Sequence, residues 1–260
     1  MKRILIVVAV GCCALPLAVF GAEHFSAAQG ISEAVPKYMP WPLFWTYLVG
    51  CALVAASLSI ATKVQVRWSG LLFGIMMFSF VAMMDIPALL ATPRDRIVVA
   101  LTLRESSFGS AGWVLAATTM GGRGTGKVLI TIGRVVLGIA AIVYGVEHFL
   151  HPLGMPGVPL EKEMPAWIPV RMFFDYLTGV FLIIAGAAFL AGKRARMAAT
   201  YLGGWIVLMV VVIYGPVLVA SLLDPSTAVK VEGLNYFFDT LLFGGAILAL
   251  AQATRAQAKS

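Results

Sequence analysis

Eight long apolar runs dominate this sequence. A helix that spans a bilayer needs about 20 mostly apolar residues, and runs of that kind follow one another from end to end. They cover approximately residues 4–24, 43–62, 68–91, 97–119, 127–149, 171–191, 196–222 and 233–253. Composition agrees, because 60% of the residues are apolar and only 12% are charged. We therefore expect an all-α integral membrane protein with eight transmembrane helices.

The fourth run is the least apolar of the eight. It carries Arg104 and Glu105 in the half that we place toward the outside, so its membrane-spanning part could start as late as Ser106. Charged groups at membrane depth are costly, and they are usually paired or functional. This run is therefore the weakest of the eight predicted spans.

A second feature is that motifs recur along the chain. Glu-His-Phe closes both the first and the fifth run, as GAEHF at 21–25 and GVEHF at 145–149. Further matches join MPWP at 39–42 to MPAWIP at 164–169, YLVG at 47–50 to YLTG at 176–179, and, at a constant spacing of 129, Arg67 to Arg196, Gly74 to Gly203, Pro87 to Pro216 and Asp95 to Asp224. We predict two four-helix units, residues 1–121 and 126–260. An even number of spans preserves orientation, so these units should be parallel repeats.

The repeat also bears on the start of the chain. A basic pair, an apolar core and small residues near Gly21 fit the pattern of a cleaved signal peptide. However, the run that precedes Glu23 matches residues 127–146, which lie in mid-chain. We therefore expect the first run to stay in the protein as a membrane helix.

Charge distribution predicts the orientation in the membrane, because the cytoplasmic ends of membrane helices collect Lys and Arg. With the N-terminus inside, twelve of the nineteen basic residues lie at inner ends and none of the twelve acidic residues does. The twelve are Lys2, Arg3, Lys63, Arg67, Arg123, Lys127, Arg134, Lys193, Arg194, Arg196, Arg255 and Lys259. We expect both termini to be cytoplasmic, in a bacterial inner membrane. The net charge of +7 does not indicate a nucleic-acid partner, since no basic run is interleaved with stacking aromatics.

Both Glu-His-Phe copies fall at the outer ends of predicted helices. The candidate ligand-binding residues there are Glu23, His24, Glu147, His148 and His151. Two interpretations stay open: a quasi-two-fold axis brings the Glu-His pairs toward one site, or each motif only ends a helix with an aromatic anchor. Three histidines with a carboxylate would suit zinc or iron, but no His-Glu-x-x-His motif occurs. We predict no metal site.

Asp239 is the sixth candidate, about two turns inside the last predicted helix. A carboxylate at that depth needs a partner, and Arg104, Arg171 or a histidine could provide one. The alternative to a functional role is a structural ion pair between the two halves.

The motifs together resemble those of the DoxX-like membrane proteins. The second half contains GVEHFLHP, MPAWIP, FFDYLTGVFLIIAGAAFL and NYFFDTLLFGGAILAL, and the first half contains GAEHF, MPWPLFWTYLVG and the weaker LRESSFGSAG. The resemblance covers nearly the whole chain as two tandem units. It implies a membrane component connected with quinone redox chemistry, similar to the small membrane subunits of quinone-linked sulfur oxidation or terminal oxidase systems.

Three functions remain open at this point. In the first, a quinone or another small amphipathic ligand binds at the outer face, His24 or His148 meets its carbonyl, and Glu23 or Glu147 orients the imidazole. Electrons would come from a redox partner subunit, because the sequence holds no flavin, haem or iron–sulfur motif. In the second, the repeats transport a small solute, with Asp85, Asp175 and Asp239 as coupling acids. In the third, the protein is a non-catalytic assembly or accessory factor.

Overall fold

The computed structural model describes residues 2–121, 124–154 and 162–257. Secondary structure in these ranges is helical, apart from an isolated bridge between Gly154 and Glu163. Two residues named above, Arg123 and Lys259, lie outside the described residues. The six long uninterrupted α-helices are α1 (Lys2–Ser26), α3 (Pro42–Thr62), α6 (Arg96–Thr118), α7 (Thr125–Leu150), α8 (Arg171–Ala191) and α11 (Thr227–Gln257).

Two further long segments each contain a short π-helical stretch. The first is α4 (Val66–Phe80), η1 (Val81–Asp85) and α5 (Ile86–Ala91), and the second is α9 (Ala195–Met209), η2 (Val210–Tyr214) and α10 (Gly215–Leu223). A proline follows each π stretch by two residues, at Pro87 and Pro216. Because proline has no N–H to donate, the helical hydrogen-bond ladder is interrupted there, and a π turn accommodates the interruption. A single turn, α2 (Ala28–Ser32), follows α1.

All eight predicted runs are helical, but only seven of the long segments are apolar enough to count as membrane spans. The exception is α6, whose hydropathy is lowered by Arg104 and Glu105. It nevertheless starts at Arg96, ten residues before the latest start that the sequence allowed, because Asp95 caps it. The Asp95 Oδ1 accepts the backbone N–H of Ile97 at 2.9 Å and that of Val98 at 3.4 Å.

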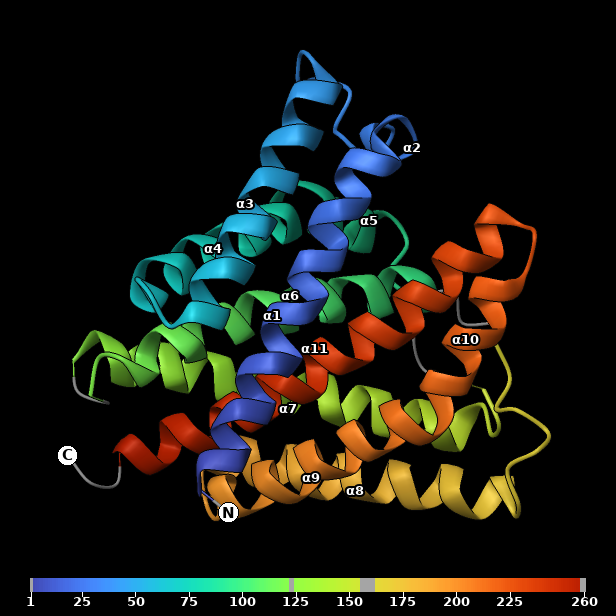
Figure 1. Cartoon of the computed structure of the whole chain (residues 1–260). Helices are drawn as coiled ribbons and strands as arrows, with labels where there is room; N and C mark the ends of the chain where they lie inside the picture. Colours follow the sequence, from blue (N-terminus) through green and yellow to red (C-terminus); the bar gives the residue numbers. More distant parts are fainter. Residues whose placement is uncertain (1, 122–123, 155–161, 258–260) are drawn as a thin grey trace.

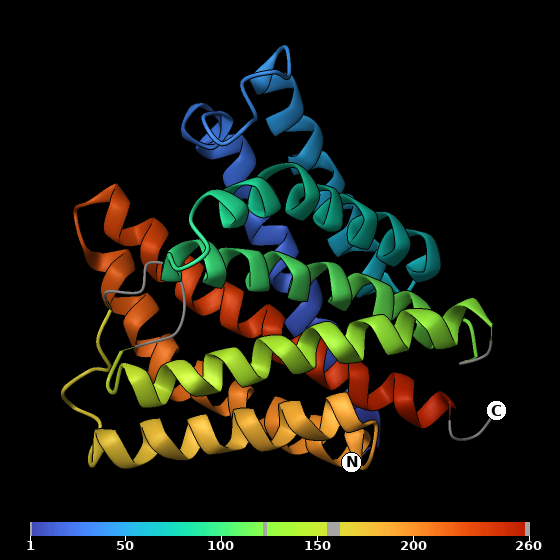
Figure 2. The ribbon, with the colours of Figure 1, turned by 180° about the vertical axis from the view of Figure 1, so that it is seen from behind.

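The two central helices of the molecule are α6 and α11, which pack against each other. On one side α6 contacts α4 and α7, and on the other α11 contacts α9 and α1. The pair α1–α3 contacts this central pair through α1, which packs against α11, and the pair α7–α8 contacts it through α7, which packs mainly against α6 (Figures 1 and 2). The core is densest around α11, where Leu242, Ala246, Ile247 and Leu250 have no exposed surface.

Unusual backbone conformations recur 129 residues apart. Non-glycine residues rarely adopt positive φ angles, so such residues mark specific turns. The positions that share this conformation at a spacing of 129 are Trp41 and Val170, Lys63 and Gly192, and Gln65 and Arg194. The two π stretches, residues 81–85 and 210–214, have the same spacing.

Glycines let α1 approach α3, and α7 approach α8, at corresponding places. A Cβ added to Gly50 would lie 2.8 Å from the His24 Cβ, and one added to Gly179 would lie 3.0 Å from the His148 Cβ. Stacked rings flank both contacts, Phe25 with Tyr47 and Phe149 with Tyr176. Close helix contact over small residues is typical of membrane proteins, and here it fixes the position of each histidine.

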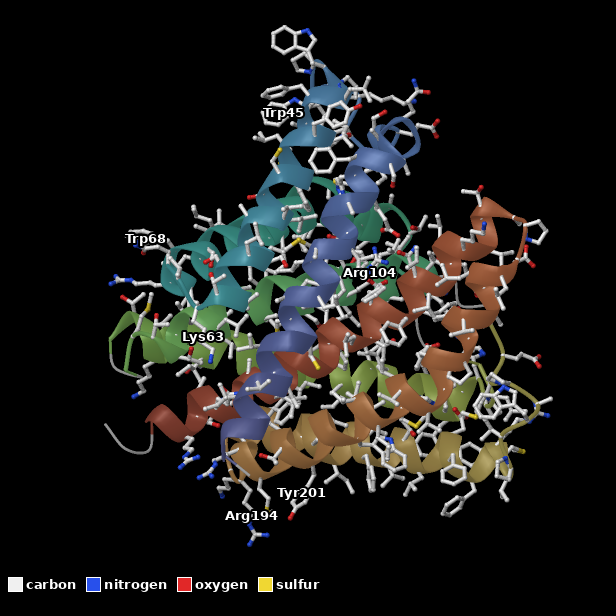
Figure 3. All side chains as sticks on the ribbon, in the orientation of Figure 1. Trp45, Lys63, Trp68, Arg104, Arg194 and Tyr201 are labelled. Atoms are coloured by element: carbon white, nitrogen blue, oxygen red, sulfur yellow. The ribbon has the colours of Figure 1, made fainter. Side chains whose placement is uncertain are left out.

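The start of α1 and the end of α11 lie on the same side of the helix bundle, toward the lower left of Figure 1. In Figure 3, Lys63 and Arg194 lie toward that side, whereas Trp45 lies at the far end and Arg104 lies inside the molecule. Which side faces the cytoplasm stays a prediction from the distribution of Lys and Arg.

Candidate functional site

A buried histidine–aspartate pair joins α7 to α8. His148, near the end of α7, is 6% exposed, and Asp175, in the first turns of α8, has no exposed surface. The His148 Nδ1 lies 2.6 Å from the Asp175 Oδ1, and the other carboxylate oxygen accepts the backbone N–H of Leu153 at 3.1 Å. Both oxygens of the buried carboxylate are therefore hydrogen-bonded, as such groups require.

This pairing determines what the imidazole can offer to a ligand. An ionised carboxylate only accepts, so opposite an ionised Asp175 the proton of the shared hydrogen bond belongs to the His148 Nδ1. The remaining ring nitrogen, Nε2, is then an acceptor when the ring is neutral and a donor when the ring is protonated. A carboxylate that fixes a histidine in this way orients the ring, as it does for histidines that bind metals.

His148 lines a cavity of about 70 Å³ between α7, α8, α9, η2 and α11, which Gly154 and Met164 also line. A single water needs roughly 10–15 Å³ of such space, so the cavity can hold several waters or the edge of a small ring. Most of its wall is aliphatic, methionine and phenylalanine side chains. The polar groups in the wall are His148, Thr178, Tyr214, Thr240 and Tyr144.

The hydroxyl groups of this wall are held by hydrogen bonds to their neighbours. Thr178 accepts the indole N–H of Trp205 at 3.0 Å and donates to the carbonyl of Phe174 at 2.8 Å. Tyr214, the last residue of η2, hydrogen-bonds the side chain of Thr240. π turns in helices occur frequently at functional sites, and this one directs Tyr214 into the wall of the cavity.

The expected role of Glu147 as the group that orients His148 is wrong, because Asp175 has that role. Consecutive helical residues point about 100° apart, so Glu147 turns from α7 toward α6 while His148 turns toward α8. The Glu147 Oε2 accepts from the Arg96 Nε at 2.9 Å and from a terminal nitrogen of Arg96 at 2.5 Å. His151, largely exposed, lies 4.0 Å from the same oxygen.

The first half has the corresponding histidine without an aspartate partner. His24 Nδ1 lies 2.7 Å from the carbonyl of Phe20, in its own helix. The position equivalent to Asp175 is Thr46, because each residue directly precedes the tyrosine of the repeated motif. The Thr46 hydroxyl donates to the carbonyl of Pro42 in its own helix. The ends of α1 and α7 also diverge in Figures 1 and 2, so the two Glu-His pairs do not form one site.

Asp239 belongs to a charged cluster between the two central helices. Of the three partners predicted for Asp239, the structure shows Arg104, whose Nη1 lies 2.9 Å from the Asp239 Oδ2. The Nη2 of Arg104 lies 3.2 Å from the Glu105 Oε1. Glu23 lies within electrostatic range of Asp239, and Asp85 of Glu105. Within the described residues, Glu23 Oε1 and Asp85 Oδ2 are buried without a hydrogen-bond partner.

Histidine, cysteine and carboxylate side chains do not gather into a metal site in residues 2–121, 124–154 and 162–257. No group of three such residues lies close enough to hold an ion there. His24 is on α1, and His148 is already bonded to Asp175.

Comparisons with known proteins add no family to this description. The chain matches no family model, no curated protein and no solved structure. The resemblance to DoxX-like proteins therefore remains a prediction from the sequence motifs.

Proposed function

We propose that the chain is a pair of tandem four-helix units that cross the membrane eight times, α6 included. The two-unit arrangement is supported by the positive-φ residues and the π stretches, which recur at a spacing of 129 residues. A chain with seven crossings would have its ends on opposite sides, whereas both ends lie on one side of this bundle. At 1.5 Å per residue, the 23 residues of α6 are also long enough to cross.

Within this bundle, the cavity beside His148 binds the carbonyl-bearing edge of a small amphipathic ligand, for which a quinone head group is the best candidate. The observation that carries the proposal is the buried His148–Asp175 pair, which leaves one ring nitrogen for an occupant of a mostly apolar cavity. Small-molecule sites commonly combine apolar walls with a few oriented polar groups. Thr178, Tyr214 and Thr240 supply further hydroxyls.

His148 would hydrogen-bond the carbonyl and exchange one proton with it, while Asp175 holds the ring in place. A bound quinone would supply the redox chemistry, and the electrons would come from a partner subunit. This is the function to which the motif resemblance also points.

The test is to purify the protein in mild detergent and to extract and quantify bound quinone. The wild type should retain quinone, the variant His148→Ala should lose it, and the matched variant His24→Ala should keep it. His24 is the right control because its Nδ1 bonds within its own helix. Quinone binding that survives in His148→Ala, or that is absent from a wild type reconstituted with excess quinone, would contradict the proposal.

Transport is the second candidate, and the unpartnered Glu23 and Asp85 oxygens favour it. Carboxylates at membrane depth are where a proton or a cation would be held. Solute uptake into liposomes that depends on Asp239 and not on His148 would support transport over ligand-linked redox chemistry.

A further inference from the structure

A second cavity lies where α6 begins and α7 ends. Its volume is about 180 Å³, and residues of the turn between α5 and α6 complete its wall. Tyr144 lines both this cavity and the one beside His148. Its hydroxyl donates to the carbonyl of Ala100 at 3.1 Å, which fixes the ring between the two spaces. The second cavity is therefore a separate candidate site, and it does not depend on the function proposed above.

The wall of this cavity carries more positive than negative charge. Two guanidinium groups, Arg94 and Arg96, and one carboxylate, Glu147, line it. Arg96 directs two nitrogens at a single Glu147 oxygen, so that carboxylate is already engaged. Arg94 makes no hydrogen bond or ion pair with the part of the chain that the structure describes. Asp95, between the two arginines, does not line the cavity and caps α6.

The rest of the wall is apolar. Val99, Ala100 and Val143 face the space together with the ring of Tyr144. The cavity therefore has an apolar wall, formed by side chains of α6 and α7, and a cationic rim, formed by Arg94 and Arg96 at the start of α6. In the predicted topology these ends lie at the outer membrane–water interface, where lipid head groups lie.

We propose that this cavity binds an anionic amphiphile, with its phosphate at Arg94, beside the Arg96–Glu147 ion pair, and the start of its acyl chains against Val99 and Val143. Guanidinium groups match phosphate oxygens with two parallel hydrogen bonds. Basic pockets between membrane helices on the cytoplasmic or matrix side bind lipid head groups, and the same charge complementarity applies at the outer side. The apolar wall distinguishes a lipid from free phosphate, because a free anion gains nothing from it.

The experiment uses the full-length protein, delipidated in a neutral detergent, and native mass spectrometry. The probes are a short-chain phosphatidylglycerol, a phosphatidylcholine of the same chain length, and inorganic phosphate. The wild type should retain phosphatidylglycerol in preference to the other two. Arg94→Gln should weaken this retention by about fivefold, the factor that one basic residue near a lipid head group is worth.

The matched control is Lys37→Gln, which removes one positive charge from the same predicted side of the membrane at an exposed position outside the cavity. It should bind phosphatidylglycerol as the wild type does. Equal weakening in both variants would show general charge attraction and overturn the site. Equal binding of inorganic phosphate and phosphatidylglycerol would overturn the lipid as its occupant. Because His148 is not in this cavity, quinone binding should be unchanged in Arg94→Gln.

Discussion

Two histidines in equivalent sequence motifs have different chemical surroundings. His148 meets a buried carboxylate from the neighbouring helix, whereas His24 bonds back to its own helix. The difference comes from one position, Asp175 in the second half and Thr46 in the first. A candidate site in one half therefore does not imply the same site in the other.

Asp175→Ala should destabilise the protein. The substitution leaves the His148 Nδ1 and the Leu153 N–H without their acceptor, and an unsatisfied buried polar group costs about 1–3 kcal/mol. Thr46→Ala is the matched control, because the carbonyl of Pro42 also accepts within the helix and no group is left unpaired. Thermal unfolding in detergent should show a clearly larger loss for Asp175→Ala. Equal losses would mean that the His148–Asp175 pair contributes no specific stability.

The histidines, but not their partners, could be predicted from the sequence. The repeated Glu-His-Phe motif predicts His148 as a candidate, and the depth of Asp239 in its helix predicts a partner such as Arg104. The sequence suggested Asp175 only as a coupling acid for transport and not as the partner of His148, because the rotation of α8 against α7 decides which side chains meet. The adjacent Glu147 was the nearest carboxylate in sequence, yet it faces another helix. Tyr214 and Thr240 were missed as cavity residues for the same reason.

At the scale of the helices, close packing at glycine fixes the site. Gly179 lies against α7 beside His148, and a methyl group there would lie 3.0 Å from the carbonyl oxygen of Gly145 and 2.8 Å from the ring of Phe149. The backbone oxygen cannot move aside without shifting α7. The position of His148 relative to Asp175 therefore depends on this contact.

Gly179→Ala should lower stability by about 1–3 kcal/mol, the usual cost of overpacking, and should weaken ligand binding at His148. Gly204→Ala is the control, because a Cβ at Gly204 meets nothing within 4 Å. The two variants can be compared by thermal unfolding and by retained quinone. If Gly179→Ala behaves as Gly204→Ala does, the helices are not held as closely as the structure indicates.

Helix bounds were predictable wherever apolar residues mark them. The range predicted for α8, 171–191, is the range observed. By contrast, α11 starts at Thr227, six residues before the predicted 233, because its first turns include Lys230 and Glu232. An apolar-run criterion cannot detect a polar helical extension. The π stretches were indicated only indirectly, by Pro87 and Pro216.

At the scale of the whole molecule, α6 decides the architecture. It is the least apolar long helix, yet it lies at the centre and pairs with α11 through Arg104 and Asp239. If α6 crosses the membrane, the second half has the orientation of the first, and the cavities beside His148 and Arg94 open toward the outer side. If it does not cross, the second half is inverted.

Cysteine accessibility tests this arrangement most directly. Lys37→Cys, Val64→Cys, Ala166→Cys and Lys193→Cys would each be introduced singly, after Cys12, Cys13 and Cys51 are replaced by alanine; all four positions are exposed. The positions form two pairs separated by 129 residues, 37 with 166 and 64 with 193. A membrane-impermeant thiol reagent added to intact cells should label 37 and 166, and should reach 64 and 193 only after the membrane is opened. Labelling that places 37 and 166 on opposite sides would contradict the account.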